Sequence, residues 1–200
     1  MKFADLIIGA VMAIGTMAPA AAATITGGNP VIDRTFYDGF RNFSILDGNN
    51  PISATGALTS WSIFSRDPAL GGARLLIYRS NGTGYDLVRA SGLETPASAG
   101  FQTFSLAPGF YVQGGDLLGL YFENFGATEY DLTPGGFMLY TANNSGFGNA
   151  TNFVGSSERT YSLSVTGTVP EPAAWTMMLT GFGGMGVALR SRRRTGAVSA

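Results

Sequence analysis

Short stretches in which hydrophobic and polar residues alternate recur along most of the chain. In residues 58–65, Trp61 and Ile63 alternate with serines, which is the pattern of a half-buried β-strand. Residues 161–167 alternate in the same way and predict a closing strand. Residues 117–122 instead form a continuous apolar run, which predicts a strand covered on both faces.

Turn residues separate these stretches. Asn81 and Gly82 lie between β-rich runs at 74–79 and 85–89, which predicts a hairpin with a short loop, since Asn and Gly readily take the positive φ that most residues resist. Pro108-Gly109 predicts another turn, between strands at 101–106 and 110–112. We expect residues 143–152, rich in Asn, Gly and Ser, to form a long exposed loop.

The pattern contains eight or nine short strands and no helix between the two ends of the chain. It therefore predicts an all-β body over residues 24–168, built as a two-sheet β-sandwich or jelly roll. The segment 110–121 resembles the strand–turn–strand hairpin of extracellular jelly-roll modules. The abundance of glycine, at 29 residues, and a charged fraction of only 12% fit an extended all-β surface protein.

The first 23 residues have the features of a secretory signal peptide. Lys2 gives a positive start, residues 6–17 an apolar core, and Ala21 and Ala23 the small residues that favour cleavage after Ala23. Such a segment implies passage through the Sec translocon. An uncleaved N-terminal anchor is the alternative, and the short core disfavours it.

The last 32 residues, 169–200, combine three unlike parts. Pro170-Glu171-Pro172 comes first, followed by a run without charges at 173–189 and a basic cluster of Arg190, Arg192, Arg193 and Arg194. As a transmembrane helix the run would reach about 25 Å, at the short limit for a bilayer. The arginines would stay cytoplasmic. Four glycines and two threonines in the run predict a temporary tether rather than a permanent anchor.

This order of parts resembles the PEP-CTERM sorting signal of proteins exported by Gram-negative bacteria. The resemblance extends to Trp175, Met177 and Met178 and to the Gly-Phe-Gly-Gly cluster at 181–184. It implies recognition by an exosortase, a membrane protease that cleaves near the motif. A simple membrane anchor with a chance Pro-Glu-Pro is the alternative. The chain thus divides into a signal peptide (1–23), a β body (24–168), a sorting signal (169–194) and a cytoplasmic tail (195–200).

Composition excludes several kinds of chemistry. The chain has no cysteine and no histidine, so disulfides, Ser-His or Cys-His catalysis and a conventional zinc site are ruled out. Lys2 is the sole lysine. Between residues 24 and 169, seven Arg against eleven Asp and Glu give a net charge of −4, which offers nucleic acid no basic surface.

An enzyme would have to rely on a carboxylate pair. The candidates are Asp116, Glu123, Glu94 and Glu129, and their spacing in the sequence distinguishes none of them.

For the body, ligand binding is a stronger hypothesis than catalysis. Trp61, Tyr78, Tyr85 and Tyr111 are the aromatic side chains that could carry a sugar ring, although the pattern favours Trp61 as a core residue. Oxygen-bearing side chains at 47–50 suggest calcium, but turn chemistry is the favoured interpretation of this segment. No metal or cofactor is expected.

Two functions from different classes follow. The first is an exported, non-catalytic protein of the cell surface or extracellular matrix, tethered to the membrane only transiently and associated with exopolysaccharide in a biofilm. The second is a carbohydrate-binding module. A glycoside-active enzyme is the least favoured alternative.

Overall fold

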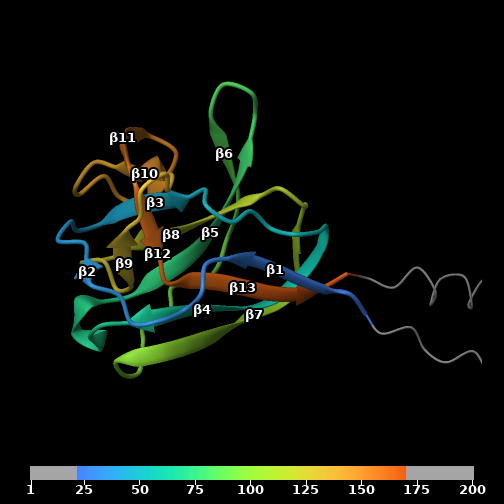
Figure 1. Cartoon of the computed structure of the whole chain (residues 1–200), viewed down its shortest axis with the longest axis horizontal. Coiled ribbons are helices and arrows are strands. Elements are labelled where there is room, and N and C mark those ends of the chain that lie inside the picture. Colours follow the sequence, from blue (N-terminus) through green and yellow to red (C-terminus); the bar gives the residue numbers. More distant parts are fainter. Residues whose placement is uncertain (1–21, 170–200) are drawn as a thin grey trace, which may run out of the picture. The chain divides into compact units, whose positions relative to one another are not determined.

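The structure, a computed structural model, describes residues 22–169, and the all-β class is confirmed (Figure 1). The strands are β1 (Thr24–Gly28), β2 (Phe36–Tyr37), β3 (Phe43–Asp47), β4 (Gly56–Ser65), β5 (Ala73–Ser80), β6 (Tyr85–Ala90), β7 (Gly100–Val112), β8 (Leu117–Phe122), β9 (Glu129–Leu132), β10 (Met138–Thr141), β11 (Phe153–Ser157), β12 (Arg159–Tyr161) and β13 (Leu163–Thr168). Two short 3-10 helices, η1 (Pro68–Leu70) and η2 (Phe147–Asn149), lie between strands.

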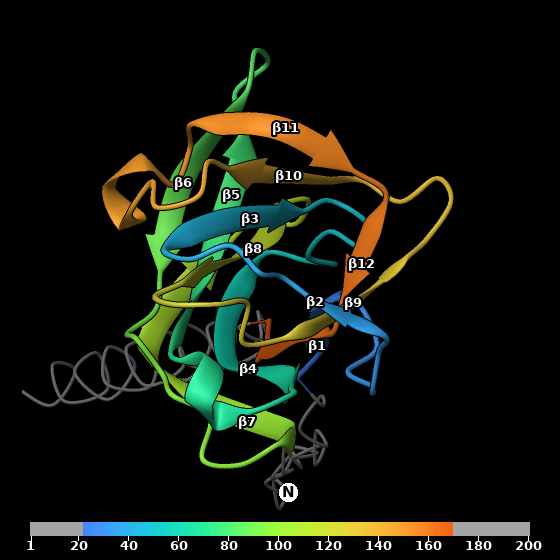
Figure 2. The ribbon, with the colours of Figure 1, turned by 90° about the vertical axis from the view of Figure 1, so that its left-hand side faces the viewer.

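Two larger sheets form the layers of the domain. One has the strand order β1-β13-β4-β7 and the other β11-β10-β3-β8-β5-β6; Figure 2 shows the six-stranded sheet above the four-stranded one. A third sheet, β12-β9-β2, was not predicted. Its strands are only two to four residues long, too short to give a periodic pattern in the sequence.

One hydrophobic core joins the two larger sheets. Trp61 and Ile63 from β4 and Leu75 and Ile77 from β5 are completely buried in it. Burial of each such side chain contributes about 1.5–3 kcal/mol, and no disulfide is available to replace that contribution. The described residues fall in one compact unit that holds its own core, so this part of the chain has the contacts to fold by itself.

A second apolar cluster covers the outer face of the six-stranded sheet. Leu46, Leu76 and Tyr78 form it together with Ala150. Tyr78 donates a hydrogen bond from its hydroxyl to the Ala150 carbonyl, at 2.8 Å. The expectation of a merely exposed loop at 143–152 is therefore wrong in part, because this loop also carries Phe147, which packs on the same cluster.

Strand β8 is apolar on both faces, as predicted. Leu118 and Leu120 point into the core between the sheets, while Leu117 and Tyr121 pack in the outer cluster. Gly119 lies between them, and a Cβ there would meet the Ile45 carbonyl oxygen at 2.2 Å and the Tyr78 ring at 2.5 Å.

The hairpin of β5 and β6 is confirmed, with Ser80 paired to Tyr85 across its end. Of the two turn residues, Gly82 has positive φ, at 89°. Asn81 is not at positive φ and contributes to the turn with its side chain: Oδ1 accepts hydrogen bonds from the backbone N–H groups of Thr83 and Gly84, at 3.1 and 2.8 Å.

The predicted turn at Pro108-Gly109 is wrong. Strand β7 runs unbroken from Gly100 to Val112 and pairs with β4 on both sides of these residues. Between the paired positions Leu58–Phe110 and Ser60–Ser105 the register shifts, so Pro108 and Gly109 form an irregular bulge within the strand.

The segment 110–121 is also not a hairpin. Strand β7 belongs to the four-stranded sheet and β8 to the six-stranded sheet. The turn at Gly114-Gly115 therefore carries the chain from one layer to the other, with Gly115 at a φ of 90°.

Several predictions concern residues outside the described range. They are the signal peptide up to Ala21, the Pro170-Glu171-Pro172 motif, the membrane segment 173–189 and the arginines at 190–194. Within residues 22–169, no helix is long and apolar enough to cross a membrane.

Close packing at Gly119 predicts a strong effect of a single methyl group. Gly119→Ala should lower the free energy of unfolding of a fragment comprising residues 24–169 by about 3 kcal/mol, because the added Cβ overlaps backbone as well as Tyr78. Gly39→Ala is the matched control, since its Cβ would meet no atom within 4 Å. Urea denaturation measures both, and equal midpoints would contradict the packing described.

Candidate functional site

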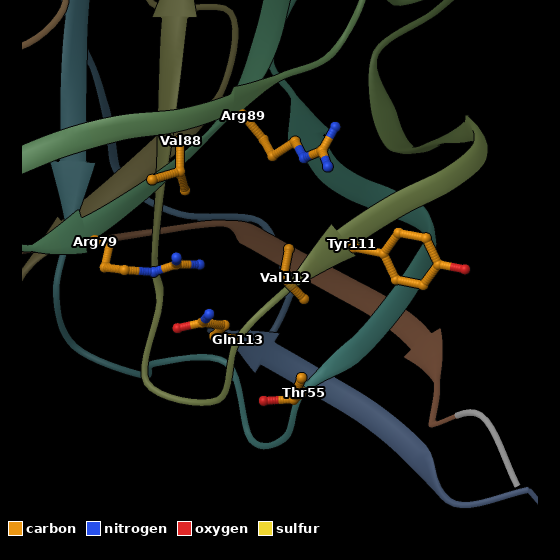
Figure 3. Close-up of a pocket in the computed structure, with 7 residues that line it drawn as sticks. All are labelled: Thr55, Arg79, Val88, Arg89, Tyr111, Val112 and Gln113. Carbon is orange, nitrogen blue, oxygen red and sulfur yellow. The ribbon is translucent and has the colours of Figure 1, made fainter.

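A cleft opens between the edge strands of the two larger sheets. It has a volume of about 360 Å³ and lies where β6 and the end of β7 come together (Figure 3). Its lining residues are Thr55, Arg79, Val88, Arg89, Tyr111, Val112 and Gln113. They come from three separate parts of the chain, which only the folded domain brings together.

A buried carboxylate fixes one wall of the cleft. Asp116 is 2% exposed and accepts a hydrogen bond from the Gln113 backbone N–H at 2.8 Å. Arg79 donates to the same carboxylate from Nε at 2.7 Å and from Nη2 at 2.8 Å. Because Gln113 follows β7 and Arg79 lies on β5, Asp116 connects the two layers beside the cleft.

The Arg79–Asp116 pair also holds the Arg79 guanidinium in place beside the cleft. Its hydrogen bonds to Asp116 raise the pKa of Arg79 above the ordinary value of an arginine, so this guanidinium stays protonated. A two-bond fork holds the planar group in one orientation. The bonds to Asp116 use Nε and Nη2, which leaves Nη1 available to a ligand. In Figure 3 the Arg79 side chain extends toward Val112 and Gln113.

A β-bulge places Arg89 beside the cleft. Tyr78 pairs with Leu87 and Ile77 with Arg89, so Val88 is the extra residue of β6. Successive side chains of a regular strand point to opposite faces, but at a bulge two neighbours are redirected. Val88 and Arg89 accordingly both line the cleft.

Tyr111 forms the outer rim. Its neighbours Phe110 and Val112 are buried in the core, whereas Tyr111 is 57% exposed. Figure 3 shows the Tyr111 ring and the Arg89 guanidinium projecting toward the same side of the view. Thr55 also lines the cleft, and its hydroxyl accepts a hydrogen bond from the Gly114 N–H at 3.0 Å.

The aromatic residues predicted to bind sugar lie elsewhere. Trp61 and Tyr78 have no exposed surface, so neither ring offers a face to a ligand. The prediction that they bind sugar is therefore wrong. Trp61 is the core residue that its pattern favours. Tyr85 is half-buried in the outer cluster, with its ring 6.5 Å from that of Phe153. Of the four aromatic residues considered, Tyr111 alone lines the cleft.

The candidate carboxylates do not come together as one group. Asp116 precedes β8 and Glu123 follows it, which separates them by about 23 Å of extended chain. Glu129 is buried in the third sheet, where burial raises its pKa and the Arg34 N–H donates to it at 2.7 Å. Glu94 bridges to Ala73 at the beginning of β5, through its backbone.

The segment at 47–50 is held by turn chemistry. Both Asp47 oxygens accept N–H groups: Oδ1 from the backbone and side chain of Asn49, and Oδ2 from Asn29 and the Tyr161 backbone. Burial raises the pKa of Asp47 although these bonds oppose the shift. Within the described residues, no group of three or more acidic side chains could hold a metal ion.

Sequence reasoning missed Arg79, Arg89, Thr55 and Gln113. The two arginines each lie near an end of a recognised hairpin strand, and this position was a usable signal. The sequence could not predict that the two arginines would lie beside Gln113. Their position depends on the bulge at Val88 and on the crossing of the chain from one sheet to the other.

The described chain ends at the beginning of the predicted sorting signal. Strands β1 and β13 pair from Thr24–Thr168 to Gly28–Ser164. Beyond them, Val169 donates from its N–H to the Ala23 carbonyl at 2.9 Å. The last hydrogen bond of this edge in the described part of the chain therefore involves Val169, the residue before Pro170, and its partner is Ala23, the predicted signal-cleavage residue.

Comparison with known families identifies one segment. Residues 168–194 match the PEP-CTERM protein-sorting motif, so the resemblance read from Pro170-Glu171-Pro172, the apolar run and the arginines is confirmed. No curated protein and no solved structure matches the chain at a significant level. The motif supports exosortase-dependent sorting of an exported surface protein, and it begins at the last residue of β13.

The role of Asp116 can be tested by removing its charge alone. Asp116→Asn should lower the free energy of unfolding by about 2 kcal/mol, because an amide NH₂ would face Arg79 or the Gln113 N–H in place of an acceptor. Glu123→Gln, the same change at an exposed position, should leave the urea midpoint unchanged. Equal effects of the two substitutions would contradict the structural role given to Asp116.

Proposed function

We propose that this chain is an exported, non-catalytic protein of the cell surface or extracellular matrix, cleaved by an exosortase near Pro170-Glu171-Pro172 and associated with exopolysaccharide. The observation that carries the proposal is the position of the PEP-CTERM motif at 168–194, which begins at the last residue of the last strand. The β domain is then the exported cargo, and the C-terminal segment that follows it is the sorting signal.

The two predicted processing regions meet at one edge of the domain. Residues 22–23 precede β1 and Val169 follows β13, and these strands are neighbours. Removal of the segments before Thr24 and after Val169 would leave the β1–β13 pairs from Thr24–Thr168 to Gly28–Ser164 in place, and would remove only the bond from the Val169 N–H to the Ala23 carbonyl beyond them. This supports a mature domain that keeps its stability after both cleavages.

The residues available to the domain support a non-catalytic role. Between Thr24 and Val169 there is no His, Cys or Lys, which leaves carboxylates as the conventional acid–base groups. The Asp116 carboxylate beside the cleft is already engaged in hydrogen bonds from Arg79 and from the Gln113 N–H. A paired acid is also too far away at Glu123.

The carbohydrate-binding module is the second candidate function, and the cleft favours it. An exposed aromatic ring beside several side-chain donors is a typical arrangement for holding a polar ligand with apolar faces. The two functions are compatible, since a matrix protein has to contact the matrix.

Processing at both ends makes a prediction about mass. The protein released from the cells should begin at Thr24 and lack Arg190–Arg194, as intact-mass spectrometry of the cell-free fraction would show. Recovery of Arg194 in released protein would contradict cleavage, and a Met1 terminus would contradict the signal peptide.

The sorting motif can be tested in the full-length chain. Replacing Pro170, Glu171 and Pro172 together with alanine should leave the protein in the membrane fraction of a host that contains an exosortase, because the protease loses its recognition element. Glu123→Ala, an exposed acidic position in the body, is the control and should be released normally. Release of the triple variant at the normal level would overturn the proposal.

A further inference from the structure

The cleft between β6 and β7 carries one uncompensated positive charge, that of Arg89, on an acidic domain. Two of its lining side chains are the arginines Arg79 and Arg89, and no acidic side chain is among its lining residues. The body from residue 24 to 169 carries seven Arg against eleven Asp and Glu, a net charge of −4. The charge of Arg79 is offset by Asp116, so Arg89 supplies the uncompensated positive charge, and on such a background it gives the cleft a local preference for anions.

The two arginines differ in the way they are held. Arg79 is fixed by its two bonds to Asp116 and presents its remaining N–H groups from a set position. Arg89 is exposed and forms no ion pair within residues 22–169. A guanidinium matches a carboxylate in shape and hydrogen-bonding geometry. The cleft thus combines a guanidinium held in one orientation, that of Arg79, with the exposed guanidinium of Arg89, which can change its orientation to meet a ligand.

The remaining lining residues suit a sugar better than a simple ion. The Tyr111 ring, 57% exposed, provides an apolar face at the rim, and the Thr55 hydroxyl and Gln113 amide provide neutral hydrogen-bonding groups. The volume of about 360 Å³ lies within the range of small-ligand sites. The cleft is open rather than enclosed, which allows a polymer to enter without threading its end.

We propose that this cleft binds a polysaccharide whose sugars carry carboxylates, with Arg79 and Arg89 on the carboxylates and Tyr111 against a sugar ring. The inference rests on the proposed association with exopolysaccharide and names the class of polymer. Thr55 and Gln113 contact ring hydroxyls in this arrangement. The charge of the ligand, rather than ring stacking alone, then provides selectivity over neutral glucans.

The test uses a purified fragment of residues 24–169, which contains all the sheets and both apolar clusters. Polygalacturonate is the acidic probe, and its fully methyl-esterified form is a neutral polymer with the same rings. At about 0.1 M salt, where long-range attraction is screened, the fragment should bind polygalacturonate at least about tenfold more tightly than the ester. Dextran sulfate, a polyanion without carboxylates, should bind more weakly than polygalacturonate.

Matched variants locate the site. Arg89→Gln should weaken polygalacturonate binding about tenfold, and Tyr111→Ala about fivefold. Arg41→Gln makes the same charge change at an exposed arginine outside the cleft, and Phe101→Ala removes a ring of similar exposure from the other end of β7. Both controls should change binding less than about twofold, and unchanged urea midpoints would show that all four variants are folded.

The outcomes separate the two proposals. Equal weakening by Arg89→Gln and Arg41→Gln would overturn the inference, because binding would then reflect overall charge. Tighter binding of the methyl ester or of dextran sulfate would overturn the carboxylate preference and leave association with polysaccharide standing. If the fragment binds no polymer, the cleft proposal fails, while the release assay on the full-length chain still decides whether the protein is an exosortase substrate.

Discussion

The arrangement of this domain depends most on the hydrogen bonds that the buried Asp116 carboxylate accepts from Arg79 and from the Gln113 N–H. The chain leaves the four-stranded sheet after Val112 and enters the six-stranded sheet at Leu117. Asp116 secures that crossing by binding the Gln113 N–H on one side and Arg79 on the other. Its backbone takes part as well, since its carbonyl accepts a hydrogen bond from the Ile52 N–H at 2.8 Å. A buried acid with these partners fixes β7 relative to β5, and the cleft is the space left beside that junction.

The rest of the domain is stabilised by two apolar clusters without covalent help. The inner core joins the two larger sheets, and the outer cluster is closed by the loop that carries Phe147 and Ala150. Strand β8 belongs to both clusters, and Gly119 is the position where the Tyr78 ring crosses it. A domain that forms its core in this way is suited to export without disulfides, because no oxidation step is needed for its stability.

The fold was predictable where a local pattern decided it. The alternation around Trp61, the apolar run at 117–122 and the Asn81-Gly82 hairpin each reflect interactions among neighbouring residues or along one strand. The prediction failed at Pro108-Gly109, because residues typical of a turn also form bulges, and only pairing with β4 distinguishes the two. The short strands of the third sheet gave no period to detect.

The candidate site was less predictable than the fold. Tyr111 could be named from its type, but Trp61 and Tyr78 carried the same chemical signal and are buried. Arg79 and Arg89 reach the cleft because of an ion pair spanning 37 positions in the chain and a bulge at Val88. Neither feature has a sequence signature. The sorting signal was readable in full because it is a linear motif, defined by order and spacing rather than by contacts between distant segments.

The central claim is that the domain binds its ligand at the cleft between β6 and β7. NMR of the fragment during titration with a short galacturonate oligomer tests it most directly. The account predicts that shifts concentrate on the guanidinium signals of Arg79 and Arg89 and on the backbone signals of Tyr111 and Gln113, and saturate together. Saturating shifts centred elsewhere, for example on the exposed aromatic residues Phe36, Tyr37 and Phe40, would contradict it.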